Sequence, residues 1–363
     1  MSTIHYPGRL ALQQRVLPSY RVPFFDLLAQ SCEGGVSLFA GASRSVEMIV
    51  SGKPQVAKYY EAKNIHLFSG AFYLCYQQGF INWLEEWKPN ALIMEANPRY
   101  LSTSSAVKWM HKRGRKVIGW GLGSPHLSGP FAGFRQMRRL SFLSQFDALI
   151  AYSQRGAAEY AGLGFPREKI FVAHNSVSLA PSQILDHRPQ TIDNPTILFV
   201  GRLQARKRVD LLLRACAEIE SKPRLIIVGD GPEREILESL AKDIYPSAEF
   251  IGAKHGAELK PHFAKADLFV LPGTGGLAVQ EAMSYGLPVI VAKGDGTQDD
   301  LVRAGNGWQI TPEDYDALVS TMKNALSDIA RLRRMGKESY RIVREEINIQ
   351  KMVDSFITAL NSF

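Results

Sequence analysis

A glycine-rich turn in the second half of the sequence gives the first indication of chemistry. Gly273, Gly275 and Gly276 follow the apolar run ADLFVLPG and stand directly before a stretch that we predict to be a helix over 277–284. Glycine lets a ligand approach the backbone closely, and the unpaired N–H groups at a helix start suit a diphosphate. Taken alone, a turn without a ligand, with Glu281 as an ordinary surface residue, explains the segment equally well.

A cluster of cations follows a second apolar run, TILFV. Gly201 and Arg202 end this run, and Arg206, Lys207 and Arg208 come shortly afterwards. Open α/β sheets bind ligands at the carboxyl ends of their strands. There an arginine can hold phosphate oxygens through two hydrogen bonds, while a lysine supplies a point charge. A solvated basic loop is the alternative interpretation.

A third strand, turn and helix is indicated by LIIVGDGPEREILESL. Gly229 and Asp230 lie in its turn, where glycine again allows a nucleotide to approach the backbone. Asp230 has a simpler explanation as the N-cap of the following helix.

Polar residues of the first half lie where elements are expected to begin or end. Arg15, Tyr20 and Arg21 stand in LQQRVLPSYRVPFF, and Asn97 and Arg99 follow the strand-like run NALIME. We interpret these five residues as ligand-binding, with the arginines facing an anionic group. Ordinary surface positions at the start of a helix, and an N-cap role for Asn97, are the alternatives.

The segment PFAGFRQMRRLSFL combines arginines with large apolar residues. Arg135, Arg138 and Arg139 share it with Phe131 and Phe134. A basic amphipathic helix of this kind can lie on an anionic membrane surface. A helix packed on its own domain is the alternative.

Two α/β domains are needed to position these residues. Short aliphatic runs alternate with helical stretches along the whole chain, namely VSLFAG, NALIME, RKVIGWG, FDALIAYS and KIFVAHN in the first half and TILFVGR, PRLIIVGDG, AEFIGA, ADLFVLPG and LPVIVAK in the second. Such runs are typical of parallel strands buried on both faces. Two series predict an α/β fold of two doubly wound, Rossmann-like domains.

The domain boundaries are also readable. We expect the first domain over 1–178 and the second over 195–345. A polar, proline-containing linker lies near 178–195, and a last helix over 346–363 could pack back on the first domain. Gly286 is expected to end the helix that begins at 277.

Composition and charge narrow the class of protein. The 363 residues are 45% hydrophobic and carry a net charge of +8. A basic excess suits nucleic acid, an anionic membrane or a phosphorylated ligand, but the basic residues lie at turns without a stacking platform, so we expect no nucleic-acid partner. Neither a signal peptide nor an apolar run of about 20 residues is present. We therefore expect a cytoplasmic protein with peripheral contact at the inner membrane face.

The three cysteines do not suggest a metal site or a disulfide framework. Cys32, Cys75 and Cys216 are far apart, and the last two stand in apolar surroundings. We expect buried free thiols. No metal-binding motif is evident, so we assign no metal ligand and no cofactor.

Four motifs occur in a fixed order over about 196–325, namely VGRLQARK, VGDGPERE, FIGAKHG and PGTGGLAVQEAMSYGLPVIV. Together they resemble the retaining GT-B glycosyltransferases of the group 1, or GT4, family, and the first half resembles that family more loosely. The resemblance implies the GT-B fold, two Rossmann-like domains facing across a cleft. It also implies that Arg202 and Lys207 stabilise the departing nucleoside diphosphate and that Glu281 holds the ribose.

The resemblance extends to the donor nucleotide. It implies that the distal phosphate binds the backbone of Gly275, Gly276 and Leu277, and that the base lies near Gly252, Ala253 and Lys254. Gly201, Gly229 and Asp230 complete the expected nucleotide-binding set.

Two positions depart from the family pattern. The first glutamate of the E-x7-E element is replaced by Gly273, and the histidine of the common W-G-H-G segment is replaced by Leu122. His126, four residues further on, is assigned as a substitute catalytic residue. A structural or exposed loop histidine is the alternative.

The expected activity is therefore metal-independent, retaining transfer of a sugar from a UDP-sugar or GDP-sugar to a hydroxyl group. The acceptor is expected to be a lipid-linked or polysaccharide precursor of a cell-surface glycan. It would bind the first domain, over 1–178, and the nucleotide sugar would bind the second, over 195–345. The acceptor-binding residues are expected to be Arg15, Tyr20, Arg21, Asn97 and Arg99. A sugar-nucleotide epimerase of similar architecture and a non-catalytic, nucleotide-sugar-binding partner subunit are the alternatives.

Overall fold

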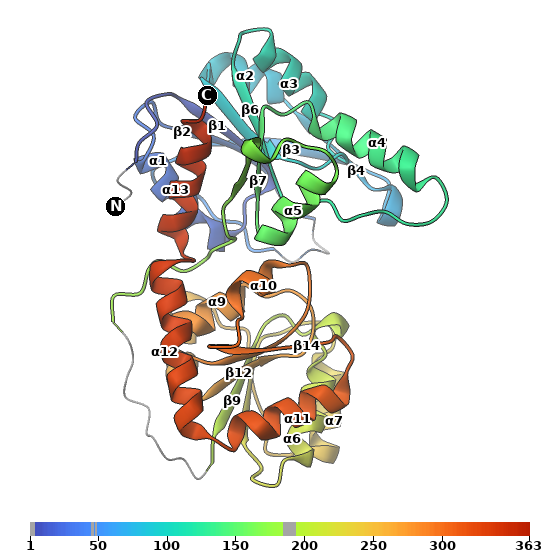
Figure 1. Cartoon of the computed structure of the whole chain (residues 1–363), viewed down its shortest axis with the longest axis vertical. Coiled ribbons are helices and arrows are strands. Elements are labelled where there is room, and N and C mark those ends of the chain that lie inside the picture. The colour runs from blue at the N-terminus through green and yellow to red at the C-terminus, as the bar shows by residue number, and fades with distance from the viewer. Residues whose placement is uncertain (1–3, 45–46, 48, 184–193) are drawn as a thin grey trace. The chain divides into compact units, whose positions relative to one another are not determined.

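The computed structural model describes residues 4–44, 47, 49–183 and 194–363. The chain forms two compact units, drawn in Figure 1. Unit 1 comprises Met1–Val177 and Ile349–Phe363, and unit 2 comprises Ser178–Asn348. The linker expected near 178–195 lies partly outside the described residues, at 184–193. Its first described residues are held within unit 2, since the hydroxyl group of Tyr340 donates to the carbonyl of Pro181 at 3.1 Å.

Unit 1 is built on one eight-stranded sheet in the order β4-β3-β2-β1-β5-β6-β7-β8. Neighbouring strands are parallel except β3 and β4, which are antiparallel. The strands are β1 (Leu10–Val16), β2 (Val36–Gly41), β3 (Lys58–Leu67), β4 (Leu74–Gln78), β5 (Ala91–Glu95), β6 (Lys116–Gly121), β7 (Ala148–Ala151) and β8 (Ile170–Val172).

Helices cover both faces of this sheet, because strand side chains alternate between them. Leu10 and Leu12 belong to a core with α1 and α13, while Ala11 between them belongs to a second core with α2 and α3. In Figure 1, α13 lies beside α1, and the rings of Phe24 and Phe356 meet at 4.9 Å. The helices are α1 (Val22–Gln30), α2 (Phe80–Trp87), α3 (Thr103–His111), α4 (Ala132–Leu143), α5 (Gln154–Gly162) and α13 (Ile349–Leu360).

Strand β1 lies in the middle of the sheet, yet it is absent from the strands that the aliphatic runs predict. Its sequence LALQQRV contains Gln13 and Gln14, both buried. Both side chains are hydrogen-bonded, because Gln13 Nε2 donates to Gln77 Oε1 at 2.5 Å and Gln14 Nε2 donates to the Gln13 backbone carbonyl at 3.2 Å. Gln77 Nε2 donates in turn to the Gln14 backbone carbonyl at 3.1 Å. Because Gln13 and Gln14 are polar, the aliphatic runs did not predict this central strand. Its glutamines are tolerated in the core because they are hydrogen-bonded.

Unit 2 has a six-stranded, fully parallel sheet in the order β11-β10-β9-β12-β13-β14. Its strands are β9 (Thr196–Val200), β10 (Arg224–Val228), β11 (Glu249–Gly252), β12 (Leu268–Leu271), β13 (Val289–Ala292) and β14 (Gly307–Ile310). Its helices are α6 (Val209–Glu218), α7 (Arg234–Ile244), α8 (Lys260–Lys265), α9 (Leu277–Ser284), α10 (Thr297–Leu301), α11 (Tyr315–Leu326) and α12 (Ile329–Glu345).

The ten predicted strands are all present, and the predicted α/β fold class is confirmed. The helix predicted over 277–284 is also confirmed, and Gly286 follows it with φ 70°. The three cysteines are buried free thiols, as expected. The runs did not predict the antiparallel pair β3–β4, because charged and polar residues interrupt the apolar residues of β3, and Ala62 is the one buried residue of that strand.

Candidate functional site

The glycine turn, Gly273–Gly276, joins the end of β12 to the start of α9. Gly275 has φ 75° and Gly276, the N-cap of α9, has φ 153°, values that side-chain-bearing residues rarely adopt. No side chain caps this helix, and its first turn carries no acidic residue. The first N–H groups of α9 are therefore oriented for an anion that no side chain of the turn supplies.

Lys207 ties the cation segment after β9 to the glycine turn. It ends a short 3-10 helix, Ala205–Lys207, and its Nζ donates to the carbonyl of Thr274 at 2.7 Å and to that of Gly275 at 3.3 Å. The Thr274 N–H donates in return to the Arg206 carbonyl at 3.0 Å. Burial, and then the neighbouring Arg206, lowers the pKa of Lys207 to about 8. The two segments thus form one site with a desolvated ammonium group.

Gly273 is required by this close approach of backbone to backbone. A Cβ atom at Gly273 would lie 2.1 Å from the carbonyl oxygen of Arg206 and 2.5 Å from the Cα of Lys207. Real Cβ atoms do not approach backbone so closely. The position at which the family carries a glutamate is therefore filled here by the backbone of the lysine segment.

The other expected nucleotide-binding residues also end strands of unit 2. Gly201 and Arg202 follow β9, and β9 pairs directly with β12, which precedes the glycine turn. Glu281 lies in α9, and burial raises the pKa of its carboxyl group. No hydrogen bond or ion pair of this carboxyl group occurs within the described ranges, which leaves it available to a ligand.

The turn after β10 is shaped by packing. A Cβ atom at Gly229 would lie 1.9 Å from the carbonyl oxygen of Gly201, so glycine is needed there without any ligand. Asp230 accepts from the N–H of Gly231 at 2.7 Å and from Arg234 Nη1 at 3.2 Å. The suggestion that Asp230 caps the following helix is wrong, because Glu233 is the N-cap of α7.

The expected base-contacting residues lie at and just after the end of β11. Gly252, the last residue of this strand, has φ 81°, and its carbonyl accepts from the N–H of Gly229 at 2.9 Å. Lys254 Nζ lies 3.6 Å from Glu258 Oε1, and Ala253 lies between Gly252 and Lys254. β11 and β10 are neighbours, so these residues lie beside the turn of Gly229.

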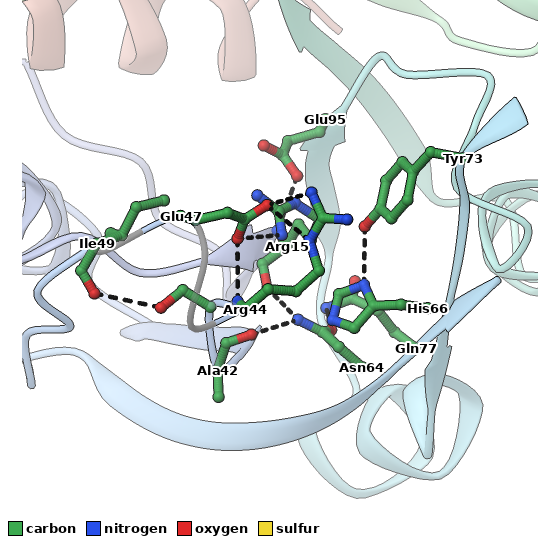
Figure 2. A network of polar contacts seen from close by, with 11 residues as sticks. Arg15, Ala42, Arg44, Glu47, Ile49, Asn64, His66, Tyr73, Gln77 and Glu95 are labelled. Atoms are coloured by element: carbon green, nitrogen blue, oxygen red, sulfur yellow. Dashed lines mark hydrogen bonds and ion pairs between the residues drawn. The ribbon is translucent and has the colours of Figure 1, made fainter. Parts of the chain in front are cut away.

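A charged network lies at the carboxyl end of β1 in unit 1 (Figure 2). Arg15 donates through its backbone N–H to Glu95 Oε2 at 2.7 Å and through Nη1 to Glu47 Oε2 at 3.0 Å. Arg44 Nη2 holds the other oxygen of Glu47 at 3.0 Å. The pKa of Glu47 is lowered because Arg15 and Arg44 both hydrogen-bond to its carboxylate, although burial opposes them.

Burial has the opposite net effect on Glu95. It raises the pKa of this carboxyl group to about 7, against the hydrogen bond from the Arg15 backbone and the charges of Arg15 and Arg21. Figure 2 also shows His66 beside Tyr73, and His66 Nδ1 lies 2.9 Å from Tyr73 Oη. Sequence reasoning named Arg15 in this network but missed Arg44, His66 and Tyr73. The network is closed by contacts between separate segments, Arg15 with Glu47 and Arg44 with the Tyr73 ring, so no local signal marked these residues.

A cavity of about 340 Å³ adjoins Glu95 in unit 1, at the carboxyl ends of β5, β6 and β7. Its walls include Asn97, Trp120, Leu122, Tyr152 and Tyr160, together with Arg139 and Phe142 of α4. Leu122, at the family's histidine position, therefore lines a cavity, whereas His126 is exposed and is not among the lining residues. The catalytic assignment of His126 stays a prediction.

The remaining acceptor candidates differ in burial. Arg21 is only 6% exposed, while Tyr20 is 46% exposed. Asn97 caps its own turn, because its Oδ1 accepts from the N–H of Arg99 at 3.1 Å. Asn97 is not the N-cap of α3, which is Ser102, and Arg99 is exposed.

Helix α4 presents an unusually exposed apolar surface. Phe131 is 82% exposed, Phe134 55% and Met137 60%, while Leu143 at the other end is buried. Arg135 and Arg138 are exposed beside them. The apolar side chains of its first two turns are therefore exposed, whereas its last turn packs on unit 1. No helix in the described part of the chain is both long and apolar enough to span a bilayer.

Within the described ranges, no three His, Cys, Asp or Glu side chains gather as a metal site would require. The cations of unit 2 are the groups that the structure offers to an anionic ligand there.

Comparison with known proteins gives a consistent result. Residues 183–342 match the sequence model of the family described as glycosyl transferases group 1. A GDP-mannose-dependent α-mannosyltransferase of Mycobacterium tuberculosis is 36% identical over 176 residues, 47% of this chain and 44% of that protein. The sulfoquinovosyl transferase SQD2 of Arabidopsis thaliana is 34% identical over 142 residues, 38% of this chain and 27% of that protein. The matches thus span less than half of these relatives.

One more distant relative and two solved structures match most of the chain. The lipopolysaccharide core biosynthesis glycosyltransferase LpsE of Rhizobium meliloti is 23% identical over 77% of this chain and 87% of that protein. The lipopolysaccharide outer core galactosyltransferase WaaB, without ligand, superposes with a TM-score of 0.68 at 18% identity, over 98% of this chain and 99% of WaaB. Anabaena HepE in complex with UDP gives 0.70 at 16% identity, over 98% and 100%.

At these identities the structural matches show the fold, and the family match covers the unit that holds the glycine turn. The predicted resemblance is confirmed for the second unit, where residues 183–342 match the group 1, or GT4, glycosyltransferase family, and the chain has the GT-B fold.

Proposed function

We propose that this protein transfers a sugar from a UDP-sugar or GDP-sugar to a hydroxyl group of a glycan or lipid-linked acceptor, with retention of the anomeric configuration. The observation that carries the proposal is the site formed by Lys207 and the glycine turn at the start of α9. The names of relatives support the donor class, because one is GDP-mannose-dependent and HepE was solved with UDP.

In the proposed reaction the bond between the anomeric carbon and the diphosphate oxygen breaks, and a bond from that carbon to the acceptor oxygen forms. The acceptor proton passes to the departing diphosphate. Negative charge grows on the diphosphate, so fixed cations and N–H groups nearby lower the barrier. Lys207, Arg202 and the first amides of α9 would supply them, with Lys207 exchanging two carbonyl oxygens for phosphate oxygens. Glu281 would accept hydrogen bonds from the ribose.

Nucleotide binding and turnover test the donor site separately. A ligand at 100 times its dissociation constant stabilises the folded protein by about 2.7 kcal/mol, so thermal shift against UDP, GDP and their sugars should reveal the preferred nucleotide. Lys207→Ala and Arg202→Ala should then reduce diphosphate release strongly while the protein stays folded. Lys242→Ala, an exposed lysine of α7, is the matched control. Turnover of the Lys207 and Arg202 variants within a few-fold of wild type would contradict these roles.

The same assay separates the alternatives. An epimerase would convert the nucleotide sugar without an acceptor. A non-catalytic partner subunit, which the changes at Gly273 and Leu122 make reasonable, would bind nucleotide but release no diphosphate with any acceptor. The proposed transferase needs both substrates.

We also propose that α4 contacts an anionic membrane surface, at the cytoplasmic face, where a lipid-linked acceptor would be found. The exposed Phe131, Phe134 and Met137 beside Arg135 and Arg138 support this proposal. LpsE and WaaB are named for lipopolysaccharide core synthesis, which supports a cell-surface glycan as the product.

Liposome sedimentation tests the membrane proposal. Each basic residue near an anionic surface contributes about 1 kcal/mol, so Arg135→Gln with Arg138→Gln should weaken binding to phosphatidylserine vesicles roughly 30-fold at low salt. The exposed pair Lys112→Gln with Arg113→Gln, at the end of α3, should leave binding unchanged. Equal binding of both double variants would refute a role for α4.

A further inference from the structure

One buried side chain of unit 2 holds both segments through which the chain passes between the units. The chain leaves unit 1 after Val177, which we call the first crossing, and returns to it after Asn348, the second crossing. Gln280 of α9 is fully buried. Its Oε1 accepts from the N–H of Ser178 at 3.2 Å, and its Nε2 donates to the carbonyl of Ile347 at 2.8 Å. Its amide group therefore contacts the chain next to each crossing.

The second crossing follows a helix that is packed tightly against the end of α9. A Cβ atom at Gly336 of α12 would lie 2.2 Å from the carbonyl oxygen of Gly286, just after α9. Asn348 holds the last turn of α12, because its Nδ2 donates to the carbonyls of Val343 at 2.8 Å and Arg344 at 3.0 Å. Close packing of this kind leaves α9 and α12 little room to shift against each other.

The first crossing is fastened to the same two helices. Besides the bond from the Ser178 N–H to Gln280 of α9, the hydroxyl group of Tyr340 of α12 donates to the Pro181 carbonyl at 3.1 Å. An amide side chain suits position 280 because it offers an acceptor to an N–H group and a donor to a carbonyl group. Elsewhere in the unit this would be a purely structural task. At the two crossings it also restrains the segments that join the units.

The helix that holds the crossings is also the helix of the candidate nucleotide site. Gly276 is the N-cap of α9, and Lys207 donates to the carbonyl of the preceding Gly275 at 3.3 Å. Glu281, the expected ribose ligand, directly follows Gln280. Gln280 is the fourth residue of α9, so it lies about one turn from the proposed phosphate site. A shift of α9 on nucleotide binding would therefore move Gln280 and the two crossings with it.

We propose that Gln280 is a positioning residue, which couples nucleotide binding at α9 to the movement of unit 1 relative to unit 2 by holding both crossings on that helix. The nucleotide at α9 rests on the proposed function, whereas the restraint on the crossings does not. Coupling between a ligand site and a conformational change typically amounts to a factor of about 5–150, which two hydrogen bonds are sufficient to supply. Sugar transfer needs donor and acceptor held together, so this coupling would serve the reaction.

Distances between spin labels on the two units, measured by pulsed electron paramagnetic resonance on the full chain, test this proposal. Lys112→Cys at the end of α3 and Lys242→Cys in α7 place one label on each unit at exposed positions, while the three natural cysteines are buried. With Gln280 present, we expect UDP or GDP, whichever binds, to shift or narrow the distance distribution. In Gln280→Met the distribution without nucleotide should be broader, and the response to nucleotide should fall about fivefold or more.

Two further variants separate this role from a merely structural one. Gln309→Met is the matched control, because Gln309 Nε2 also donates to a backbone carbonyl, that of Val302 at 2.8 Å, but from β14, which does not join the units. It should lower the Tm of unit 2 without changing the distances. Gln280→Glu keeps an acceptor for the Ser178 N–H but lacks the amide donor to Ile347, so its effect should be intermediate. Nucleotide should bind Gln280→Met within about threefold of wild type.

Four results would overturn the proposal. They are a distribution that does not respond to bound nucleotide when Gln280 is present, an unchanged distribution and response in folded Gln280→Met, the same loss of response in Gln309→Met, and a nucleotide affinity of Gln280→Met that falls as far as the response does. If Gln280→Met does not fold, Gln280→Glu decides by the same criteria. The proposed function fails by a different result, the absence of UDP and GDP binding by the wild type, and in that case the width of the distribution without nucleotide still reports on Gln280.

Discussion

Adding a single methyl group at Gly273 should disrupt the phosphate site of unit 2. The Cβ of alanine would lie 2.1 Å from the Arg206 carbonyl oxygen and 2.5 Å from the Lys207 backbone, so one of the two segments must move. The movement would break the hydrogen bond from the Thr274 N–H to Arg206 and weaken that from Lys207 to the Thr274 carbonyl. Gly273 has no positive φ, so the effect is steric and not due to backbone strain.

The expected loss follows from these contacts. Overpacking costs about 1–3 kcal/mol, and each lost hydrogen bond contributes about 0.5–1.5 kcal/mol, so Gly273→Ala should destabilise unit 2 by roughly 2–5 kcal/mol. A domain of this size loses about 2–4 °C of Tm per kcal/mol, so calorimetry should show the Tm of the unit 2 transition lowered by roughly 4–20 °C. UDP should also bind more weakly, because Lys207 is displaced.

Gly305→Ala provides the matched control in the same unit, because its Cβ would meet only the flexible Glu338 side chain, at 3.4 Å. Its Tm should change little. Gly273→Glu, which restores the family residue, should be at least as disruptive as alanine. A Gly273→Ala protein with wild-type Tm and UDP affinity, or a more active Gly273→Glu enzyme, would refute the steric reasoning.

Two further predictions concern buried charges. Burial raises the pKa of Glu95 from 4.5 to about 7, so the contribution of this carboxyl group to stability is complete below pH 4.5 and is lost as the pH rises to about 7. The free energy of unfolding of Glu95→Gln, measured with urea, should therefore rise by up to about 3 kcal/mol relative to wild type between pH 4.5 and 8. A difference that stays constant over this range would contradict the prediction. Arg333→Met leaves Asp267, its partner at 2.7 Å, buried and should cost about 3–5 kcal/mol in the same assay. Arg341→Met, in which the lost side chain is 43% exposed, should cost far less because solvent screens its ion pairs.

The sequence was most informative where one local pattern decides the structure. Aliphatic runs predicted ten strands, because a strand buried on both faces must be apolar along its length. The helix over 277–284 was equally readable from the glycines on either side. Strand β1 was missed because two glutamines interrupt its apolar run, and Gln13 is compensated by Gln77, a partner 64 positions away, which no local pattern shows.

In the candidate sites, too, some residues could be identified from a local sequence pattern, whereas the roles of others depend on residues far away in the sequence. Lys207 and the glycines of the turn were identified from their motifs, but the reason for Gly273 is the neighbouring backbone, visible only in three dimensions. Arg21 was named as a polar residue at a helix start. Its contact with the rings of Trp120 and Tyr152 depends on strands β6 and β7, about 100 and 130 residues later.

Helix α13 has a consequence for the order in which the protein is made. Its Phe356 packs into the same core as Phe24 and Trp120 of unit 1, although all of unit 2 lies between them in the sequence. Domains usually fold in the order in which the ribosome releases them. Here unit 2 can complete its core first, while unit 1, synthesised earlier, must wait with an open apolar face for its last helix. A nascent chain stalled before α13 should therefore be bound by chaperones through its N-terminal half.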